Sequence, residues 1–299
     1  MKIFATLPPP HREKSLQLVI DHPLVDSLRF NTGVRVSTNP KETLETLLRF
    51  CNGKDFWLDL KGRQLRISQW AVPTFGDIVL NHEIDVSLPA EIYFRNEEKS
   101  TIRKIKGNKI YVDPPPPKAL GAGQAVNIPD ESLKIQGYFT EEDLEYLDAA
   151  KELGIVNIML SFVEEESDIV QLTKIIPNAN IICKIESKKG IQFVKEVFPN
   201  LKNKIRLMAA RDDLFIQIGE NKSHIFPTLK SIIEADETAI LASRLFTSLE
   251  TSLEVSLSDL SDFILMKTLG YSYFLLSDGI CGNEKAFLKA MEAFAKTKI

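Results

Sequence analysis

Two carboxylates, Glu186 and Asp213, directly follow neighbouring apolar runs of this sequence. If both runs are parallel strands, the two side chains lie at one edge and could share a hard divalent cation, Mg²⁺ or Mn²⁺. Lys184 stands two residues before Glu186 and therefore points to the same face of its strand. An ammonium group there can neutralise charge that develops on a phosphate or enolate oxygen. The competing interpretation is a structural ion pair between Lys184 and Glu186.

Other strand-like runs also end in polar residues. Because the carboxyl ends of the strands of a parallel barrel meet at one mouth, these side chains are expected to converge there. They are Arg29, Asn31, Asp59, Lys61, Arg66, Ser161, Arg211, Asp212, Ser243, Arg244, Ser277 and Asp278.

The elements that must position these residues alternate between short apolar runs and amphipathic helical stretches, the pattern of strands joined by crossover helices. Eight such units predict an α/β fold, a (β/α)₈ TIM barrel. The predicted strands are 2–7, 25–30, 55–60, 156–160, 180–185, 205–209, 238–242 and 271–276. Helices are predicted at 141–153, 169–175, 190–197, 225–235 and 284–295.

The alternation is interrupted by a small β-rich insertion after the third strand. Its predicted strands are 77–80, 84–88, 91–94 and 109–112, and the tract Pro114 to Pro117 reads as a stiff linker. We therefore expect a barrel made of residues 1–67 and 128–299, with residues 68–127 forming a separate lid-like domain.

Composition excludes several classes of function. A formal net charge of -4 and a pI near 5.7 give no reason to expect nucleic acid as a partner. No stretch reaches the length of about 20 apolar residues that a membrane span needs. Three scattered cysteines and no signal peptide predict a cytoplasmic protein without disulfides. The four histidines lack ligand spacing, and no phosphate-binding GxxxxGK[ST] loop is present.

Around these strand ends the sequence resembles the pyruvate kinase family, collinearly from Lys2 to about Met291. The segment 181–187 resembles the family's active-site signature, and 207–214 resembles its M-V-A-R-G-D-L segment. Further similar runs are 28–31, 59–66, 140–143, 161–162 and 240–243 at the barrel, and 106–112 and 121–129 at the two ends of the lid.

The resemblance implies that Glu186 and Asp213 hold Mg²⁺ or Mn²⁺ and that Lys184 stabilises the transferring phosphoryl group or the enolate. Catalytic roles are also implied for Arg29 and Ser243. Substrate or phosphate binding is implied for Arg29, Asn31, Arg66, Ser161 and Asp212. The implied ligands are small anionic metabolites, namely phosphoenolpyruvate and pyruvate or another 2-keto acid, together with ADP or ATP.

This sequence departs from the family pattern at several positions. Gly33 and Leu60 replace hydroxyl residues of the potassium site, which predicts loss of the K⁺ site, and Asp212 stands where the family has glycine. The lid is shortened, and we expect no C-terminal regulatory domain. Three hypotheses remain: a phosphotransferase, metal-dependent enolate chemistry without phosphoryl transfer, and a non-catalytic metabolite-binding descendant. A homo-oligomer is left open.

Overall fold

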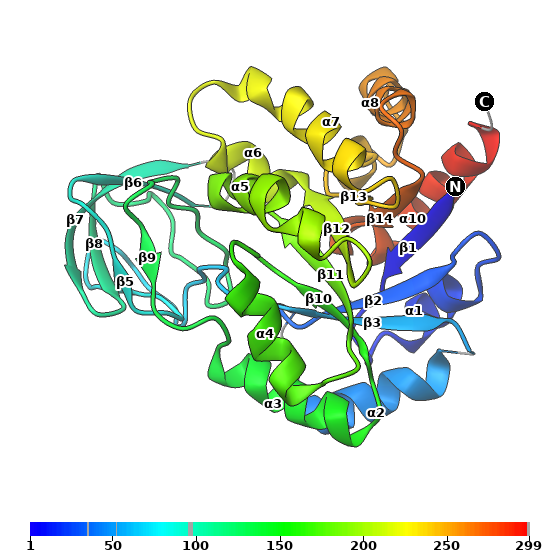
Figure 1. The fold of residues 1–299 in the computed structure, drawn as a ribbon, viewed down its shortest axis with the longest axis horizontal. Coiled ribbons are helices and arrows are strands. Elements are labelled where there is room, and N and C mark those ends of the chain that lie inside the picture. The colour runs from blue at the N-terminus through cyan, green and yellow to red at the C-terminus, as the bar shows by residue number, and fades with distance from the viewer. Residues whose placement is uncertain (35, 52, 95–97, 298–299) are drawn as a thin grey trace.

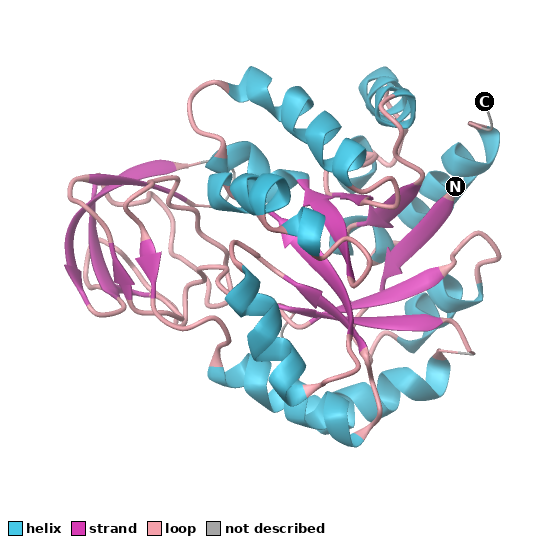
Figure 2. Cartoon of the chain, viewed as in Figure 1, coloured by secondary structure: helices cyan, strands magenta, loops and turns pink. Residues whose placement is uncertain are grey.

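The computed structural model describes residues 1–34, 36–51, 53–94 and 98–297. Eight parallel strands form a closed barrel in the order β1-β14-β13-β12-β11-β10-β3-β2, which confirms the predicted (β/α)₈ fold. The helices surround the barrel, and a β-rich lid projects from one side of it (Figures 1 and 2). The barrel strands are β1 (Lys2–Thr6), β2 (Ser27–Asn31), β3 (Asp55–Leu60), β10 (Asn157–Leu160), β11 (Asn180–Ile185), β12 (Ile205–Ala210), β13 (Ile240–Ala242) and β14 (Tyr273–Leu276).

The described helices cover the outside of the barrel. The α-helices are α1 (Glu13–Asp21), α2 (Pro40–Phe50), α3 (Glu141–Glu152), α4 (Glu166–Ile175), α5 (Lys188–Glu196), α6 (Arg211–Gln217), α7 (Ile225–Ala235), α8 (Leu257–Thr268), α9 (Asp278–Cys281) and α10 (Glu284–Lys296). Short 3₁₀ turns occur at η2 (Phe198–Asn200), η3 (Lys222–His224) and η4 (Thr247–Glu250). No helix in the described ranges is both long and apolar enough to cross a membrane.

Alternation along the strands separates two cores. On β11, Ile181, Cys183 and Ile185 pack in the large cluster between strands and helices, whereas Ile182 belongs to the smaller cluster that fills the barrel. Lys184 is therefore on the inward face with Ile182, because successive side chains of a strand point to opposite faces. Such strands are buried on both sides, which explains their nearly continuous apolar sequence.

The lid consists of one four-stranded sheet in the order β4-β8-β7-β6 and the short pair β5-β9. Its strands are β4 (Ile78–Val79), β5 (Ile84–Asp85), β6 (Ala90–Tyr93), β7 (Lys99–Lys106), β8 (Lys109–Asp113) and β9 (Lys134–Ile135). The sequence analysis missed β7, because its alternating pattern of apolar residues is interrupted by a bulge between Ile102 and Lys104.

The lid core reaches beyond the segment 68–127. Leu65 and Ile67 before it, and Ile128 after it, belong to the buried lid cluster, with Leu133 and Ile135 packed against that cluster. The pairing of β5 with β9 also joins Ile84 to Ile135. Residues on both sides of the expected boundaries thus help to form the lid core.

The seventh barrel strand is shorter than the expected 238–242. Asp236 forms a tight turn, in which its Oδ1 accepts hydrogen bonds from the backbone N–H and the hydroxyl of Thr238, at 2.9 and 2.7 Å. This side-chain turn competes with strand pairing. Pairing with β12 and β14 therefore begins only at Ile240.

Candidate active site

The carboxyl ends of the barrel strands enclose a cavity of about 180 Å³. All nine residues for which the resemblance implies a role line this cavity, namely Arg29, Asn31, Arg66, Ser161, Lys184, Glu186, Asp212, Asp213 and Ser243. Asp59, Arg211 and Arg244, which were also expected at the mouth, are not part of its lining. Residues from six strand ends that are up to 214 positions apart in the sequence thus share one small space.

A buried charge network forms the floor of this cavity. Asp59 is 2% exposed, and its Oδ2 lies 2.8 Å from Arg29 Nε and 2.7 Å from Arg29 Nη2. Its Oδ1 lies 3.3 Å from Lys184 Nζ. Burial alone would raise the pKa of Asp59, but Lys184 and Arg29 outweigh burial and hold the pKa below its ordinary value. Asp59 is therefore a charged carboxylate that joins two buried cations.

Lys184 is fully engaged by its neighbours. Its Nζ donates to Ser161 Oγ at 2.7 Å and lies 3.3 Å from Glu186 Oε1. Burial would lower the pKa of Lys184, but the carboxylates of Asp59 and Glu186 raise it above the ordinary value. The ammonium group is thus charged and held at three points on the inner wall of the barrel.

Glu186 is 2% exposed and accepts a hydrogen bond from the backbone N–H of Phe162, at 2.7 Å from Oε2. Burial raises the pKa of Glu186 to about 7, and the nearby carboxylate of Asp213 acts in the same direction, while Lys184 opposes both. A cation shared with Asp213 would favour the charged form of Glu186.

Asp213 lies in the first turn of α6 and has neutral partners only. Its Oδ1 accepts from Asn127 Nδ2 at 2.8 Å, and its Oδ2 accepts from Gln64 Nε2 at 2.9 Å. Within the described residues it forms no ion pair at contact distance, although Arg66 and Lys184 are close enough to interact with its charge through space. Neither partner was predicted from the sequence. Asn127 is the last residue of the segment 68–127 and follows no predicted strand.

The donor set at this position suits Mg²⁺. Two carboxylates, Glu186 and Asp213, line one cavity, and neither oxygen of Asp213 is taken by a cation. The described residues contain no cluster of three or more carboxylate, histidine or cysteine ligands. Mg²⁺ commonly uses one or two protein carboxylates and completes its shell with water and substrate oxygens, so this set fits it.

Arg66 lines the cavity, and among the described residues its hydrogen bonds go to neutral groups only. Its Nη1 donates to the carbonyl of Gly123 at 2.7 Å, and its Nη2 donates to the side chain of Gln64. The Nε is buried and has no partner. Arg66 also fills space beside Gly33, where an added Cβ would lie 2.7 Å from Nη2. The guanidinium group of Arg66 therefore lies next to Gly33, one of the two positions at which the hydroxyl ligands of the family's potassium site are replaced.

Ser243 and Arg244 follow β13 in left-handed conformations, with φ of 65° and 57°. Arg211 holds this turn, because its Nε and Nη2 donate to the carbonyl of Ser243 at 3.0 and 2.7 Å. Two consecutive non-glycine residues with positive φ are costly, and such strain is concentrated at functional sites. Asp212 points to Arg244, whose Nε lies 2.9 Å from Oδ1. Arg244 thus compensates the charge of Asp212.

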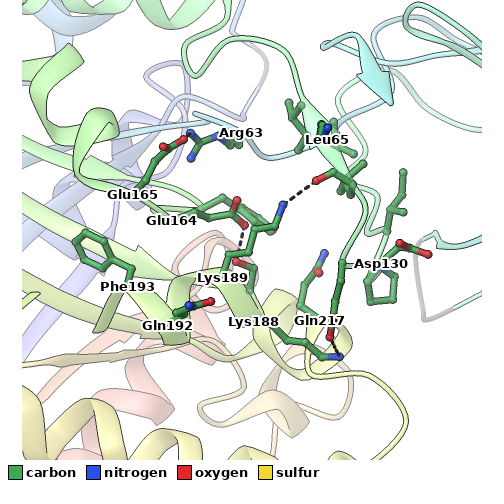
Figure 3. A pocket seen from close by; sticks show the side chains of 18 of the residues that line it. Arg63, Leu65, Asp130, Glu164, Glu165, Lys188, Lys189, Gln192, Phe193 and Gln217 are labelled. Atoms are coloured by element: carbon green, nitrogen blue, oxygen red, sulfur yellow. Dashed lines mark hydrogen bonds and ion pairs between the residues drawn. The ribbon is translucent and has the colours of Figure 1, made fainter. Parts of the chain in front are cut away.

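Larger pockets flank the mouth beneath the lid. One of about 590 Å³ lies beside α5, where Lys188 and Lys189 face the returning lid segment that contains Asp130 (Figure 3). None of the nine predicted residues lines it. A second, of about 1140 Å³, lies between the lid and α6 and includes Asp212 and Asp213. Among these pockets, the mouth cavity is the one that combines the predicted acidic, basic and hydroxyl groups.

Comparison with known proteins gives consistent matches. The family model for the barrel domain of pyruvate kinase matches residues 97–264, more than half of the chain. The pyruvate kinase of Methanocaldococcus jannaschii is 29% identical over 233 residues, which cover 73% of this chain and 50% of that protein. The pyruvate kinase of Borreliella burgdorferi is 23% identical over 222 residues, covering 65% of this chain and 45% of that protein.

The chain spans about half the length of these two curated relatives. The family match covers β7 to α8 and includes Lys184, Glu186, Asp213 and Ser243. The closed barrel, the inserted lid and the match of more than half the sequence agree, and the chain belongs to the pyruvate kinase family.

Proposed function

We propose that this chain is a pyruvate-kinase-like phosphotransferase that acts on phosphoenolpyruvate and pyruvate, with ADP or ATP as the second substrate and a divalent metal. One observation carries the proposal. In the mouth cavity, the carboxylate of Asp213 and the guanidinium group of Arg66 hydrogen-bond only to neutral groups and form no contact ion pair, within the described parts of the chain. A metal bound to a phosphorylated anion would satisfy both groups together.

In this proposal Glu186 and Asp213 hold Mg²⁺ or Mn²⁺, which when bound supplies Lewis-acid stabilisation of oxygen charge. Gln64 and Asn127 fix the orientation of the Asp213 carboxylate through their amide groups. Arg66 offers its guanidinium group to the anion. Arg29 and Asn31 contribute the other side of the cavity, and Ser161 helps to hold Lys184.

Lys184 is placed to stabilise negative charge on the substrate. The enolate oxygen gains charge when the phosphoryl group leaves, and a fixed ammonium group in a buried site stabilises that charge more than water does. Asp59, Glu186 and Ser161 hold the Nζ before the reaction, so little reorganisation is needed. Ser243 presents a hydroxyl on a rigid turn and can orient the substrate or relay a proton to the enolate carbon.

The cavity volume of about 180 Å³ suits a three-carbon acid rather than a nucleotide. A nucleotide would therefore lie in a neighbouring pocket beneath the lid, such as the one of about 730 Å³ that shares Arg66 with the mouth cavity. We also propose a cytoplasmic location, with which the buried cysteines Cys51, Cys183 and Cys281, none of them in a disulfide, are consistent.

The test is a coupled assay of pyruvate formation from phosphoenolpyruvate and ADP with Mg²⁺. Wild-type protein should turn over, and Lys184→Met should lose at least about 100-fold in kcat, because it removes the charge that stabilises the enolate. A wild-type rate no higher than that of Lys184→Met would refute the proposal.

Exchange of the methyl protons of pyruvate in deuterated buffer separates the alternatives. Exchange without phosphoryl transfer would support metal-dependent enolate chemistry, and absence of both reactions would support a non-catalytic metabolite-binding protein. Ser243→Ala is a second variant for both assays, and it tests whether the Ser243 hydroxyl orients the substrate or relays a proton. It removes the hydroxyl, while Arg211 continues to hold the backbone turn through the carbonyl of residue 243.

A further inference from the structure

Asp278 follows β14 and presents its carboxylate to the donors of the mouth cavity. Its Oδ2 accepts a hydrogen bond from Arg29 Nη1 at 3.0 Å and another from Asn31 Nδ2 at 3.0 Å. The side chain of Asp278 is 44% exposed, whereas that of Arg29 is 10% exposed. The carboxylate therefore covers the buried guanidinium group from the solvent side.

Arg29 has little capacity left for a ligand. Its Nε and Nη2 contact Asp59, and its Nη1 contacts both Asp278 and the hydroxyl of Thr6, at 3.1 Å. Each of its three nitrogen atoms thus already has an oxygen of the protein beside it. Asn31 is similarly engaged, since its Oδ1 accepts from the N–H of Gly33 and its Nδ2 donates to Asp278.

Asp278 differs in this respect from Asp212, the other acidic residue at the rim. Asp212 is paired with Arg244, which stacks on the ring of Phe215, so its charge is compensated outside the cavity. Asp278 instead uses two donors that face the cavity. It is therefore the rim carboxylate that competes directly with a ligand.

Asp278 is one of several carboxylates that hold the basic side chains of the cavity. Four basic and four acidic side chains line the space, namely Arg29, Lys61, Arg66 and Lys184 against Glu186, Asp212, Asp213 and Asp278, and Asp59 adds a buried carboxylate beneath Arg29 and Lys184. Neutralising Asp278 would remove one negative charge from the rim and weaken its hold on the donors of Arg29 and Asn31, which would then be available to an anion.

We propose that Asp278 is a specificity-determining residue, which competes with the anionic groups of a ligand for Arg29 and Asn31. It disfavours phosphorylated ligands with several negative charges relative to simple monocarboxylates. A phosphoryl group that reaches Arg29 must displace Asp278 or accept a like charge about one hydrogen-bond length away. A monocarboxylate carries a single negative charge and is therefore repelled less by Asp278. This inference relies on the proposed function only for the choice of ligands.

The experiment is calorimetric titration of the full chain in metal-free buffer, with inorganic phosphate, phosphoenolpyruvate and pyruvate as separate titrants. The variant is Asp278→Asn, which keeps the shape of the side chain and removes the charge. Asp77→Asn is the matched control, because Asp77 is exposed on the lid and its substitution changes the net charge equally. Asp278→Ser is the second variant, and thermal melts verify that each protein is folded.

We expect Asp278→Asn to bind phosphate and phosphoenolpyruvate at least about tenfold more tightly than wild type, whereas its affinity for pyruvate changes much less. Asp77→Asn should match wild type for all three ligands. Unchanged phosphate affinity in both folded Asp278 variants, or an equal gain for phosphate and pyruvate, would overturn the inference. Because no turnover is measured, tighter phosphate binding would support it even if the phosphotransferase assay fails.

Discussion

Replacing Asp59 by Asn removes the charge from the carboxylate that contacts both Arg29 and Lys184 below the mouth cavity. Asp59 is 2% exposed, and both cationic side chains are 10% exposed, so solvent cannot replace the lost charge. Removing one partner of a buried ion pair typically costs about 3–5 kcal/mol. Arg29 keeps Asp278 and Lys184 keeps Glu186, so we place the loss in unfolding free energy near the lower end of that range, at about 3 kcal/mol.

The pH dependence of this loss has a definite sign. The pKa of Asp59 in the folded protein lies below its ordinary value. Its contribution is therefore fully present above the unfolded pKa and disappears as the pH falls through the folded pKa. The difference between wild type and Asp59→Asn should shrink as the pH falls below about pH 4.

The measurement is urea unfolding followed by far-UV circular dichroism at several pH values, with Asp77→Asn as the control for the change in net charge. Asp77 is exposed, and its substitution should leave the unfolding midpoint unchanged. If Asp59→Asn is no less stable than this control at pH 7, the network does not hold two buried cations and the reasoning is wrong.

Two further predictions concern the cations of the site. Asn127→Ala should raise the Mg²⁺ concentration needed for half-maximal activity by about tenfold, because the carboxylate of Asp213 loses an orienting donor. The control is Asn108→Ala, which removes an amide that donates to the carbonyl of Leu80 in the lid. Equal effects of the two substitutions would contradict the prediction. Replacing K⁺ by Na⁺ or a large organic cation in the assay should leave the rate unchanged, because Gly33 and Leu60 lack the hydroxyl groups that bind K⁺ in the family. Activation by K⁺ but not by the other cations would show that the potassium site is retained.

The barrel and the polar residues at its mouth follow from the sequence alone. Runs such as Asn180–Ile185 are apolar on both faces, since a parallel barrel buries both, and the polar residue after each run must therefore lie at the common carboxyl edge. The same alternation places Lys184 and Glu186 on one face of β11. These rules depend only on positions near one another in the chain, so they could be applied without a structure.

Which side chains compensate one another depends instead on how the chain packs in three dimensions. Asn127 bonds to Asp213 across 86 positions, and Asp278 bonds to Arg29 across 249. Neither pairing follows from local spacing, because barrel closure brings β14 beside β1 and the return of the lid brings Asn127 to α6. For the same reason, the sequence does not reveal that Arg29 forms ion pairs with Asp59 and Asp278, whereas Arg66 hydrogen-bonds to neutral groups. Ion pairing depends on distances of a few ångströms, and those distances are fixed only when the barrel closes and the lid packs against it.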